Sequence, residues 1–250
     1  MMSVDFDHWP YPRWVAHRGA GKLAPENTLA ALRLGARHGY RMFECDAKLS
    51  AEGTPFLLHD DELERTTDGR GIAGALPWAQ LCGFDAGRWH SPAYAGEPIP
   101  SLRAVAAWVR ANGLLLDVEI KPTPGTEAET GRVVAGVCAV LWQDADIPPL
   151  LTSFRPQSLA AAQAVAPRLP RGLLLGELWE GCFDVAQQLG CVAVVFKHTL
   201  LDAPLVAKAH AARLRTGAYT PNDRLDVERV RAAGVDMVVT DAVDVFPAVD

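Results

Sequence analysis

The chain has 250 residues, of which 49% are hydrophobic and 22% charged, and its formal net charge is -6. This length is enough for one large core, as a single barrel or as two smaller domains. The acidic balance argues against a general nucleic-acid binder or a binder of anionic membranes, because both rely on summed basic charge. An anionic substrate would therefore need a local cationic site.

Five cysteines, an odd number, are scattered through the chain without a CxxC pair. This usage is typical of reduced, packed thiols in a reducing compartment. The start of the chain lacks the basic and apolar regions of a secretory signal, and no later apolar run reaches membrane-spanning length. We therefore expect a cytoplasmic protein without stable membrane association. The surface pattern carries no strong interface signal and leaves a monomer or a homodimer open.

Short apolar runs alternate with segments of helical length and spacing. The runs that predict strands are 13–17, 41–49, 55–59, 114–121, 149–154, 172–176, 191–197, 213–219 and 236–241. The segments that predict helices are 28–39, 101–113, 127–142, 157–166, 184–190, 203–214 and 224–234. Alternation of this kind indicates a parallel sheet covered by helices. At this length a (β/α)₈ TIM barrel fits best, and no linker divides the chain further.

Nine predicted strands are one too many for a barrel of eight. The link between the second and third runs is too short for a parallel crossover, so these two runs should form a hairpin. A tight turn would place Asp46 opposite Leu58. Glu44 would then face Asp60, and His59 would lie beside both carboxylates.

Residues 60–100 form the other irregularity, because they show turn chemistry and little sustained periodicity. A long loop inside a compact domain is usually functional. This one carries Phe84, Trp89, His90 and Tyr94. We interpret it as a small inserted cap over the barrel mouth.

Polar residues follow the ends of several predicted strands, where a barrel of this type holds its active site. They are His17 and Arg18 after the first strand, Glu44 and Asp46 on the second, His59 after the third, and Glu119 and Lys121 after the fourth. Three carboxylates converging from two strands suit one hard divalent cation, Mg²⁺ or Ca²⁺, more than zinc. The lack of a spaced His/Cys ligand set agrees with that choice.

Cationic and titratable side chains accompany the carboxylates. Arg18 and Lys121 add fixed positive charge beside a metal, a combination that suits a phosphate group. His17 and His59 titrate near neutral pH and supply a general acid and a general base.

Each of these features has an ordinary structural explanation when it stands alone. A Glu-x-Asp pair is usually a solvated strand face, and a single histidine at a strand end is usually structural. Their joint occurrence at three successive strand ends favours a site. Phe154 and Tyr219, also at strand ends, fit a core cap or a ligand contact equally well. Thr28 or Asn27 should cap the first helix, whose N-terminus faces the site, so Asn27 is also a candidate phosphate contact.

Several motifs then connect the chain to a known family. They are AHRGAGKLAPENTLAA, FECDAKL, LLHDDELERTTDG, GEPIPSL, VEIKP, TSF, AYTPND and GVDMVVTDAVD. In this order, and across nearly the whole chain, they resemble the glycerophosphodiester phosphodiesterases. The opening segment is most similar to the cytosolic bacterial branch associated with glycerol 3-phosphate uptake.

This resemblance implies a distorted (β/α)₈ barrel with an inserted cap and metal-dependent hydrolysis of a small-molecule glycerophosphodiester to an alcohol and glycerol 3-phosphate. By position, it implies three metal ligands, Glu44, Asp46 and Glu119, and two acid-base residues, His17 and His59. It also implies substrate contacts at Arg18, Lys121, Asn27, Phe154 and Tyr219. The family's Trp-Thr-Val-Asn motif reads Tyr219-Thr-Pro-Asn here, which departs from the family pattern at Tyr219, still a flat face for glycerol, and at Pro221.

The resemblance further implies that the glycerol 2-hydroxyl attacks phosphorus to form a cyclic glycerophosphate, with His17 as the first base and His59 as the first acid. Three alternatives stay open. They are direct attack by water in place of the hydroxyl, a related enzyme that acts on lysophospholipids, and a barrel that binds phosphate esters without catalysis.

Overall fold

The computed structural model describes residues 4–246 and 248, and within them eight parallel strands close into a barrel. The strands are β1 (Trp14–Ala16), β2 (Met42–Leu49), β4 (Leu115–Ile120), β5 (Leu150–Ser153), β6 (Arg171–Leu175), β7 (Ala193–Lys197), β8 (Arg215–Tyr219) and β9 (Met237–Thr240). Each pairs with its neighbour, and β1 pairs with both β9 and β2, which closes the ring. The fold is the predicted TIM barrel.

The ninth strand, β3 (Pro55–Leu57), pairs antiparallel with the second half of β2. Ala47 lies opposite Leu57, and the Leu58 amide donates to the Asp46 carbonyl over 3.1 Å. The predicted hairpin and its register are therefore confirmed. Because the pairing continues past the last ladder residue, the chain delivers His59 to the end of the hairpin nearest Asp46.

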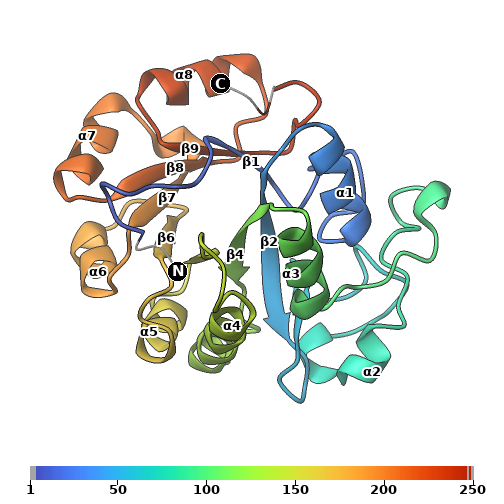
Figure 1. Cartoon of the computed structure of the whole chain (residues 1–250). Helices are drawn as coiled ribbons and strands as arrows, with labels where there is room; N and C mark the ends of the chain where they lie inside the picture. The colour runs from blue at the N-terminus through green and yellow to red at the C-terminus, as the bar shows by residue number, and fades with distance from the viewer. Residues whose placement is uncertain (1–3, 247, 249–250) are drawn as a thin grey trace.

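Helices surround the barrel as a ring in Figure 1. They are α1 (Leu29–Arg37), α3 (Leu102–Ala111), α4 (Glu127–Leu141), α5 (Pro156–Val165), α6 (Cys182–Gln188), α7 (Ala203–Ala211) and α8 (Arg224–Ala232), with a 3₁₀ turn, η3 (His198–Leu200), before α7. Side chains cap several of their first turns. Thr28 accepts the Ala31 amide and Ser101 accepts the Ala104 amide, which confirms Thr28 as the cap of the first helix.

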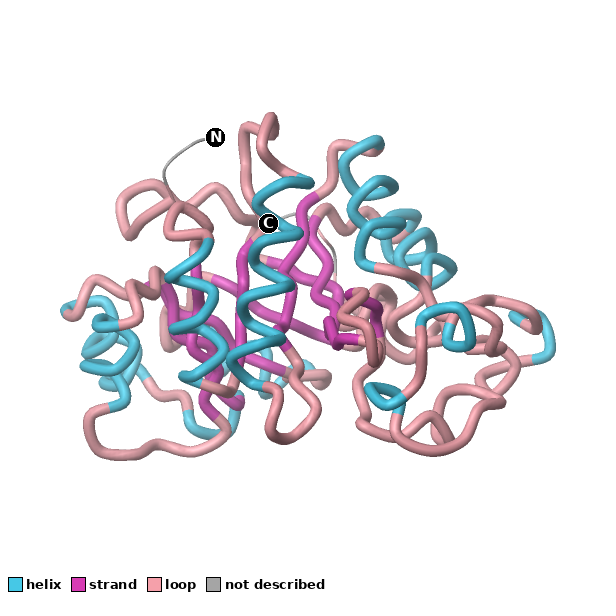
Figure 2. Tube along the Cα trace, turned by 90° about the horizontal axis from the view of Figure 1, so that it is seen from below, coloured by secondary structure: helices cyan, strands magenta, loops and turns pink. Residues whose placement is uncertain are grey.

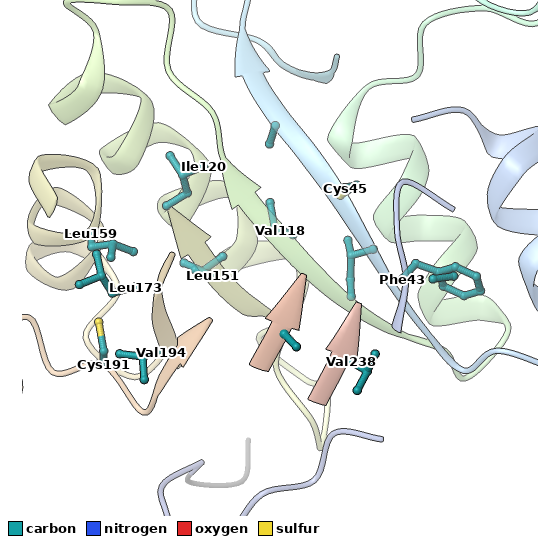
Figure 3. Packing of buried hydrophobic residues seen from close by; sticks show 14 of the residues in the cluster. Phe43, Cys45, Val118, Ile120, Leu151, Leu159, Leu173, Cys191, Val194 and Val238 are labelled. Atoms are coloured by element: carbon teal, nitrogen blue, oxygen red, sulfur yellow. The ribbon is translucent and has the colours of Figure 1, made fainter. Parts of the chain in front are cut away.

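Side chains alternate along each strand, so the buried residues divide into an outward-facing set and an inward-facing set. On β2, Phe43, Cys45 and Ala47 point outward into the layer between strands and helices, and on β4 Val118 and Ile120 do the same. Figure 3 shows residues of this layer, which packs strand against helix. The residues between them in sequence, including Glu44, Asp46 and Glu119, must therefore face the barrel interior.

A second cluster fills the opposite end of the barrel. Val4 and Tyr11, from the segment before β1, pack against Met42, Leu150 and Met237 at or near the starts of their strands. The Tyr11 hydroxyl donates to the Pro148 carbonyl over 3.0 Å. This end is sealed, so the interior is open to solvent at the ends where the strands finish.

Residues 60–100 form the insert, which contains η1 (Ala73–Ala75), α2 (Trp78–Leu81) and η2 (Pro92–Tyr94). It has its own small core, made of Phe56, Leu58, Leu63, Ala73, Leu81, Ala86 and Ile99. Both of its ends return to β3, since the Leu57 amide donates to the Pro100 carbonyl. In Figures 1 and 2 the insert lies at one side of the barrel. It packs next to β2 and β3, and its interpretation as a cap stays a prediction.

The five cysteines are free thiols, and four of them are buried while Cys82 is exposed. This agrees with the prediction of reduced and mostly packed thiols. Among the described residues, no helix is both long and apolar enough to cross a membrane.

Candidate active site

Three carboxylates meet inside the barrel near the finishing end of its strands. Asp46 on β2 lies beside Glu119 on β4 in the ladder, and Glu44 is one inward-facing position earlier. Their oxygens lie within 4.8 Å of one another, and all three side chains are buried. The predicted convergence of these residues is therefore confirmed.

Two cations lie against this triad. The Lys121 ammonium is 2.9 Å from Glu119 Oε1 and 3.5 Å from Asp46 Oδ1. The Arg18 backbone amide donates to Glu44 Oε2 over 3.1 Å, and its Nε lies 3.2 Å from Asp46 Oδ2. Both cations are placed where a phosphate group bound at the triad would meet them.

The triad retains acceptors that its neighbours do not use. Oε1 of Glu44 and Oδ1 of Asp46 are buried, and neither has a hydrogen-bond partner within residues 4–246 and 248. Buried carboxylate oxygens without donors are costly, and a cation resolves that cost. A set of three carboxylates is also the oxygen-rich donor set that Mg²⁺ and Ca²⁺ prefer. The residues present therefore fit a hard divalent cation.

The carboxyl groups of the triad differ in acidity. Burial raises the pKa of Glu44 well above its usual range, and the charges of Asp46 and Glu119 add to that effect. Burial, and then Asp46, raise the pKa of Glu119 to about 7. Burial opposes ionisation of Asp46 too, but Arg18 and Lys121 hold its pKa below the ordinary value. Without a cation, Asp46 is thus the most acidic of the three carboxyl groups.

His17 follows β1 and faces the triad through one nitrogen. Its Nδ1 lies 2.6 Å from Oδ1 of Asp241, and its Nε2 lies 3.7 Å from Oε2 of Glu44. Because a carboxylate only accepts, Nδ1 carries the proton and Nε2 is free for a substrate. Asn222 donates to Asp241 Oδ2 over 2.8 Å, which fixes that carboxylate.

Gly21 lets the two ends of the chain meet at this histidine. Its φ is +55°, and a Cβ here would lie 2.0 Å from the Asp241 carbonyl oxygen. Only glycine accepts both the left-handed backbone and this close approach without strain. The glycine-rich turn after His17 is therefore shaped around the end of β9.

His59 is held in the same way from the other side of the site. Its Nδ1 lies 2.6 Å from Oδ1 of Asp60, so its Nε2 is also left for a substrate. Burial lowers the pKa of His59, Arg18 and Lys121 act in the same direction, and Asp46 opposes them. The two histidines thus present equivalent nitrogens beside one carboxylate cluster.

Two cavities adjoin at the triad. A smaller one of about 180 Å³ is lined by His17, Arg18, Glu44, His59, Asp117, Glu119, Lys121, Thr152, Phe154, Leu174, Val195, Tyr219, Thr220 and Val239. A larger one of about 430 Å³ is lined by Lys48, His59, Asp60, Asp61, Glu119, Ile120, Lys121, Pro122, Pro124, Glu127, Ser153, Phe154 and Arg155. His59 and Phe154 line both, whereas His17 lines only the smaller cavity. Phe154 and Tyr219 meet edge to face with ring centroids 5.6 Å apart.

A family model for the glycerophosphoryl diester phosphodiesterase family matches residues 17–245, which include every residue of this site. The chain belongs to this family.

Relatives of similar length agree with the phosphodiesterase assignment. The YhdW protein of Bacillus subtilis is 30% identical over 92% of this chain and 94% of its own. A glycerophosphodiester phosphodiesterase of Caldanaerobacter subterraneus is 28% identical over 91% and 93%. The structure of an Oleispira antarctica phosphodiesterase, in complex with the product sn-glycerol-3-phosphate, is 33% identical with a TM-score of 0.86, covering 92% of this chain and 93% of that one.

Asn27 of this phosphodiesterase, whose contact with phosphate stays a prediction, binds Asp46 of the triad. Its side-chain amide donates to Asp46 Oδ2 over 2.8 Å, and its oxygen accepts the Asp46 backbone amide over 3.0 Å. Asn27 and Arg18 both have positive φ, at 58° and 50°. Such values are uncommon outside glycine and cluster at functional sites. The PENT asparagine therefore braces a carboxylate of the triad.

Three side chains that brace the phosphodiesterase site were not predicted from the sequence, namely Glu26, Asp241 and Asn222. Asp60 was predicted to lie opposite Glu44, but its contact with His59 was not predicted. Asp241 is the last residue of the last predicted strand, so the strand-end rule that selected His17 would have selected it. Glu26 and Asn222 lie in loops between elements, and only their place in family motifs marks them.

Asp117 is another residue that the sequence argument passed over. It lies on β4 beside Glu44, is buried, and accepts the Thr152 hydroxyl over 2.8 Å. Burial raises the pKa of Asp117 to about 8. It forms part of the floor of the smaller cavity, below the triad.

Proposed function

We propose that the chain hydrolyses glycerophosphodiesters to an alcohol and sn-glycerol 3-phosphate, with one divalent cation, Mg²⁺ or Ca²⁺, and with His17 and His59 as the acid-base pair. One observation carries the proposal. Two histidines, each held at Nδ1 by its own aspartate, present free Nε2 atoms beside a carboxylate triad with unpartnered oxygens. The reduced cysteines and the small-molecule substrate support a cytoplasmic location.

The cation would be held by Glu44, Asp46 and Glu119. When bound, it supplies Lewis-acid stabilisation of charge on the phosphoryl oxygens. Arg18 and Lys121 add hydrogen bonds and fixed positive charge to the same oxygens. Asn27 keeps Asp46 turned toward the triad throughout.

The smaller cavity suits the glycerol phosphate portion of the substrate. Tyr219 and Phe154 offer flat faces to the glycerol carbons. His17 lines this cavity and does not line the larger one. In the first step His17 Nε2 takes the proton of the glycerol 2-hydroxyl, whose oxygen attacks phosphorus. Asp241 steadies the imidazolium that results.

The larger cavity suits the departing alcohol. His59 lies where the two cavities meet, so its Nε2 gives a proton to the leaving oxygen as the bond from phosphorus breaks. For this step the His59 ring carries a proton on both nitrogens, and Asp60 stabilises that imidazolium through Nδ1. A cyclic glycerophosphate remains, and water opens it with the roles of the two histidines exchanged.

The decisive experiment is a coupled assay for glycerol 3-phosphate release from several glycerophosphodiesters. It is run with and without a chelator, and with Mg²⁺ or Ca²⁺ restored. We expect turnover that the chelator abolishes and one of the two cations restores. Turnover that is insensitive to the chelator would remove the cation from the proposal.

Two further substrates separate the remaining alternatives. A deoxy analogue without the 2-hydroxyl should not turn over, and normal turnover would identify water as the direct nucleophile. Lysophospholipid dispersions should be poor substrates. Activity on them without activity on glycerophosphocholine would favour a lysophospholipid enzyme.

A further inference from the structure

We propose that Arg65, in the insert, is a positioning residue that holds the proton donor His59 and the phosphate-binding Arg18 in fixed relation to each other. The inference rests on the proposed function, because it assigns Arg65 a part in that same reaction. Arg65 itself lines neither of the two cavities described above. It would act only through the carboxylates that it binds.

The Arg65 guanidinium forms two paired contacts with carboxylates. Its Nε and Nη2 donate to Asp60 Oδ2 and Oδ1 over 2.5 and 3.1 Å. Its Nη1 and Nη2 donate to Glu26 Oε2 and Oε1, both over 2.8 Å. A guanidinium can engage two carboxylates in this way because its donors form a rigid planar fork.

Each of these carboxylates holds one residue of the proposed mechanism. The Asp60 Oδ1 that accepts from Arg65 also binds Nδ1 of His59 over 2.6 Å. The Glu26 Oε1 that accepts from Arg65 also accepts Nη1 of Arg18 over 2.9 Å. One unbroken chain therefore runs from Arg18 through Glu26, Arg65 and Asp60 to His59.

The turn that carries Arg65 is firmly anchored. Leu63 is fully buried in the core of the insert, and its carbonyl accepts both the amide and the hydroxyl of Thr67, over 3.0 and 2.7 Å. Arg65 projects from between these two residues, and its side chain is 44% exposed. Without the fork, Asp60 and Glu26 would lose their common partner, although each would keep its own catalytic neighbour.

This geometry predicts two separable kinetic effects when Arg65 is replaced. If His59 is misplaced, the proton reaches the leaving oxygen less readily, so kcat should fall for a poor leaving group. If Arg18 is misplaced, the phosphoryl group binds less well, so KM should rise whatever the leaving group. A residue that only stabilised the insert would not distinguish leaving groups.

The test compares Arg65→Lys with the unmodified enzyme on two diesters of glycerol 3-phosphate. One releases choline, whose alkoxide needs a proton, and the other releases p-nitrophenol, which departs without one. We expect kcat for the choline ester to fall by about tenfold or more and kcat for the aryl ester by less than about threefold, with a raised KM for both. Arg88→Lys is the matched control, because Arg88 is in the same insert, pairs with Asp85 and is 74% exposed. Arg88→Lys should leave kcat and KM unchanged for both esters.

A double-mutant cycle keeps the inference testable if Arg65→Lys unfolds the insert. Asp60→Asn alone should show the leaving-group effect, and Glu26→Gln alone should raise KM. Adding Arg65→Lys to either of these variants should reduce activity by less than Arg65→Lys does alone, because Arg65 has already lost that carboxylate partner. Equal losses on both esters, or full additivity in the cycle, would overturn the role of Arg65. If the unmodified enzyme turned over neither ester, the proposed function itself would fail, and this inference with it.

Discussion

The orientation of each imidazole in the site is set by a single aspartate. Asp241 and Asp60 bind Nδ1 of His17 and His59 at the same distance of 2.6 Å, although one follows the last strand and the other begins the insert. This choice of tautomer leaves Nε2 of both rings directed to the substrate. Both aspartates should therefore matter to catalysis about as much as the histidines.

Replacing Asp241 by Asn should lower kcat by about 100-fold or more, because the amide can donate to Nδ1 and favour the wrong tautomer. The fold should be retained, since Asn222 can still bind the amide. Steady-state kinetics together with circular dichroism measure both effects. Asp5→Asn is the control, because Asp5 pairs with His8 on the surface 3.2 Å away. Unchanged kcat in Asp241→Asn would contradict the role of this pair.

Asp117 predicts a dependence of stability on pH. Its pKa is about 8 in the folded protein, above the value of about 4 for an unfolded chain, so the folded state holds the proton more tightly. That contribution is complete below pH 4 and is lost as the pH rises toward 8. Asp117→Asn has no such term. Its free energy of unfolding relative to the unmodified protein should therefore increase by on the order of 1 kcal/mol or more between pH 4 and pH 8.

Urea unfolding at several pH values measures this difference. Asp144→Asn serves as the comparison, since Asp144 is exposed on the surface. A constant difference between Asp117→Asn and the unmodified protein across this range would show that Asp117 ionises normally.

At the scale of elements, the hairpin and the insert show how far a sequence argument reaches. The hairpin could be predicted with its register, because a short link forbids a parallel crossover and alternation fixes which side chains face inward. The packing of the insert against β3 could not be predicted in this way. Its placement depends on a small core between β3 and α2, and contacts so distant in sequence leave no periodic signal. The contacts of Arg65 with Glu26 and Asp60 could not be predicted for the same reason.

The insert core should be a separate unit of stability. Replacing the fully buried Leu81 by Ala should cost about 3 kcal/mol locally, by loss of burial and creation of a cavity. Hydrogen exchange should then speed up for amides of the insert more than for those of the barrel strands. Catalysis of the choline ester should weaken as the turn carrying Arg65 loosens. The control is Ile72→Ala, at a position 41% exposed, which should change stability by less than about 1 kcal/mol. Uniform acceleration of exchange in Leu81→Ala would contradict a separate unit.

For the whole molecule, the stability of the folded barrel should depend on cation binding at the triad. Three buried carboxylates are a liability until a cation binds, and an ion that binds only the folded state stabilises it. The barrel and the convergence of the three carboxylates could both be predicted from sequence, because polar residues inside apolar runs are conspicuous. Which cation binds depends on ligand distances and flexibility, which the residue types alone do not encode.

Addition of Mg²⁺ or Ca²⁺ should raise the melting temperature, and more strongly at pH 8 than at pH 6. Glu119, with a pKa of about 7, and Glu44, with its raised pKa, must lose protons to bind the ion. Affinity should therefore increase by on the order of tenfold across this range, measured by calorimetry. Glu119→Gln is the control and should remove most of the binding. Affinity that is independent of pH would mean that these carboxyl groups are ionised before the ion arrives.

The pair formed by His17 and Asp241 joins residues 224 positions apart, at the seam where the first and last strands meet. The ribosome must release the chain as far as residue 241 before this aspartate can reach its histidine. Shortened products of interrupted synthesis that end before residue 241 thus carry all three carboxylates of the triad and both imidazoles, yet leave His17 without its partner. Full hydrolytic activity should therefore require translation to pass the end of β9.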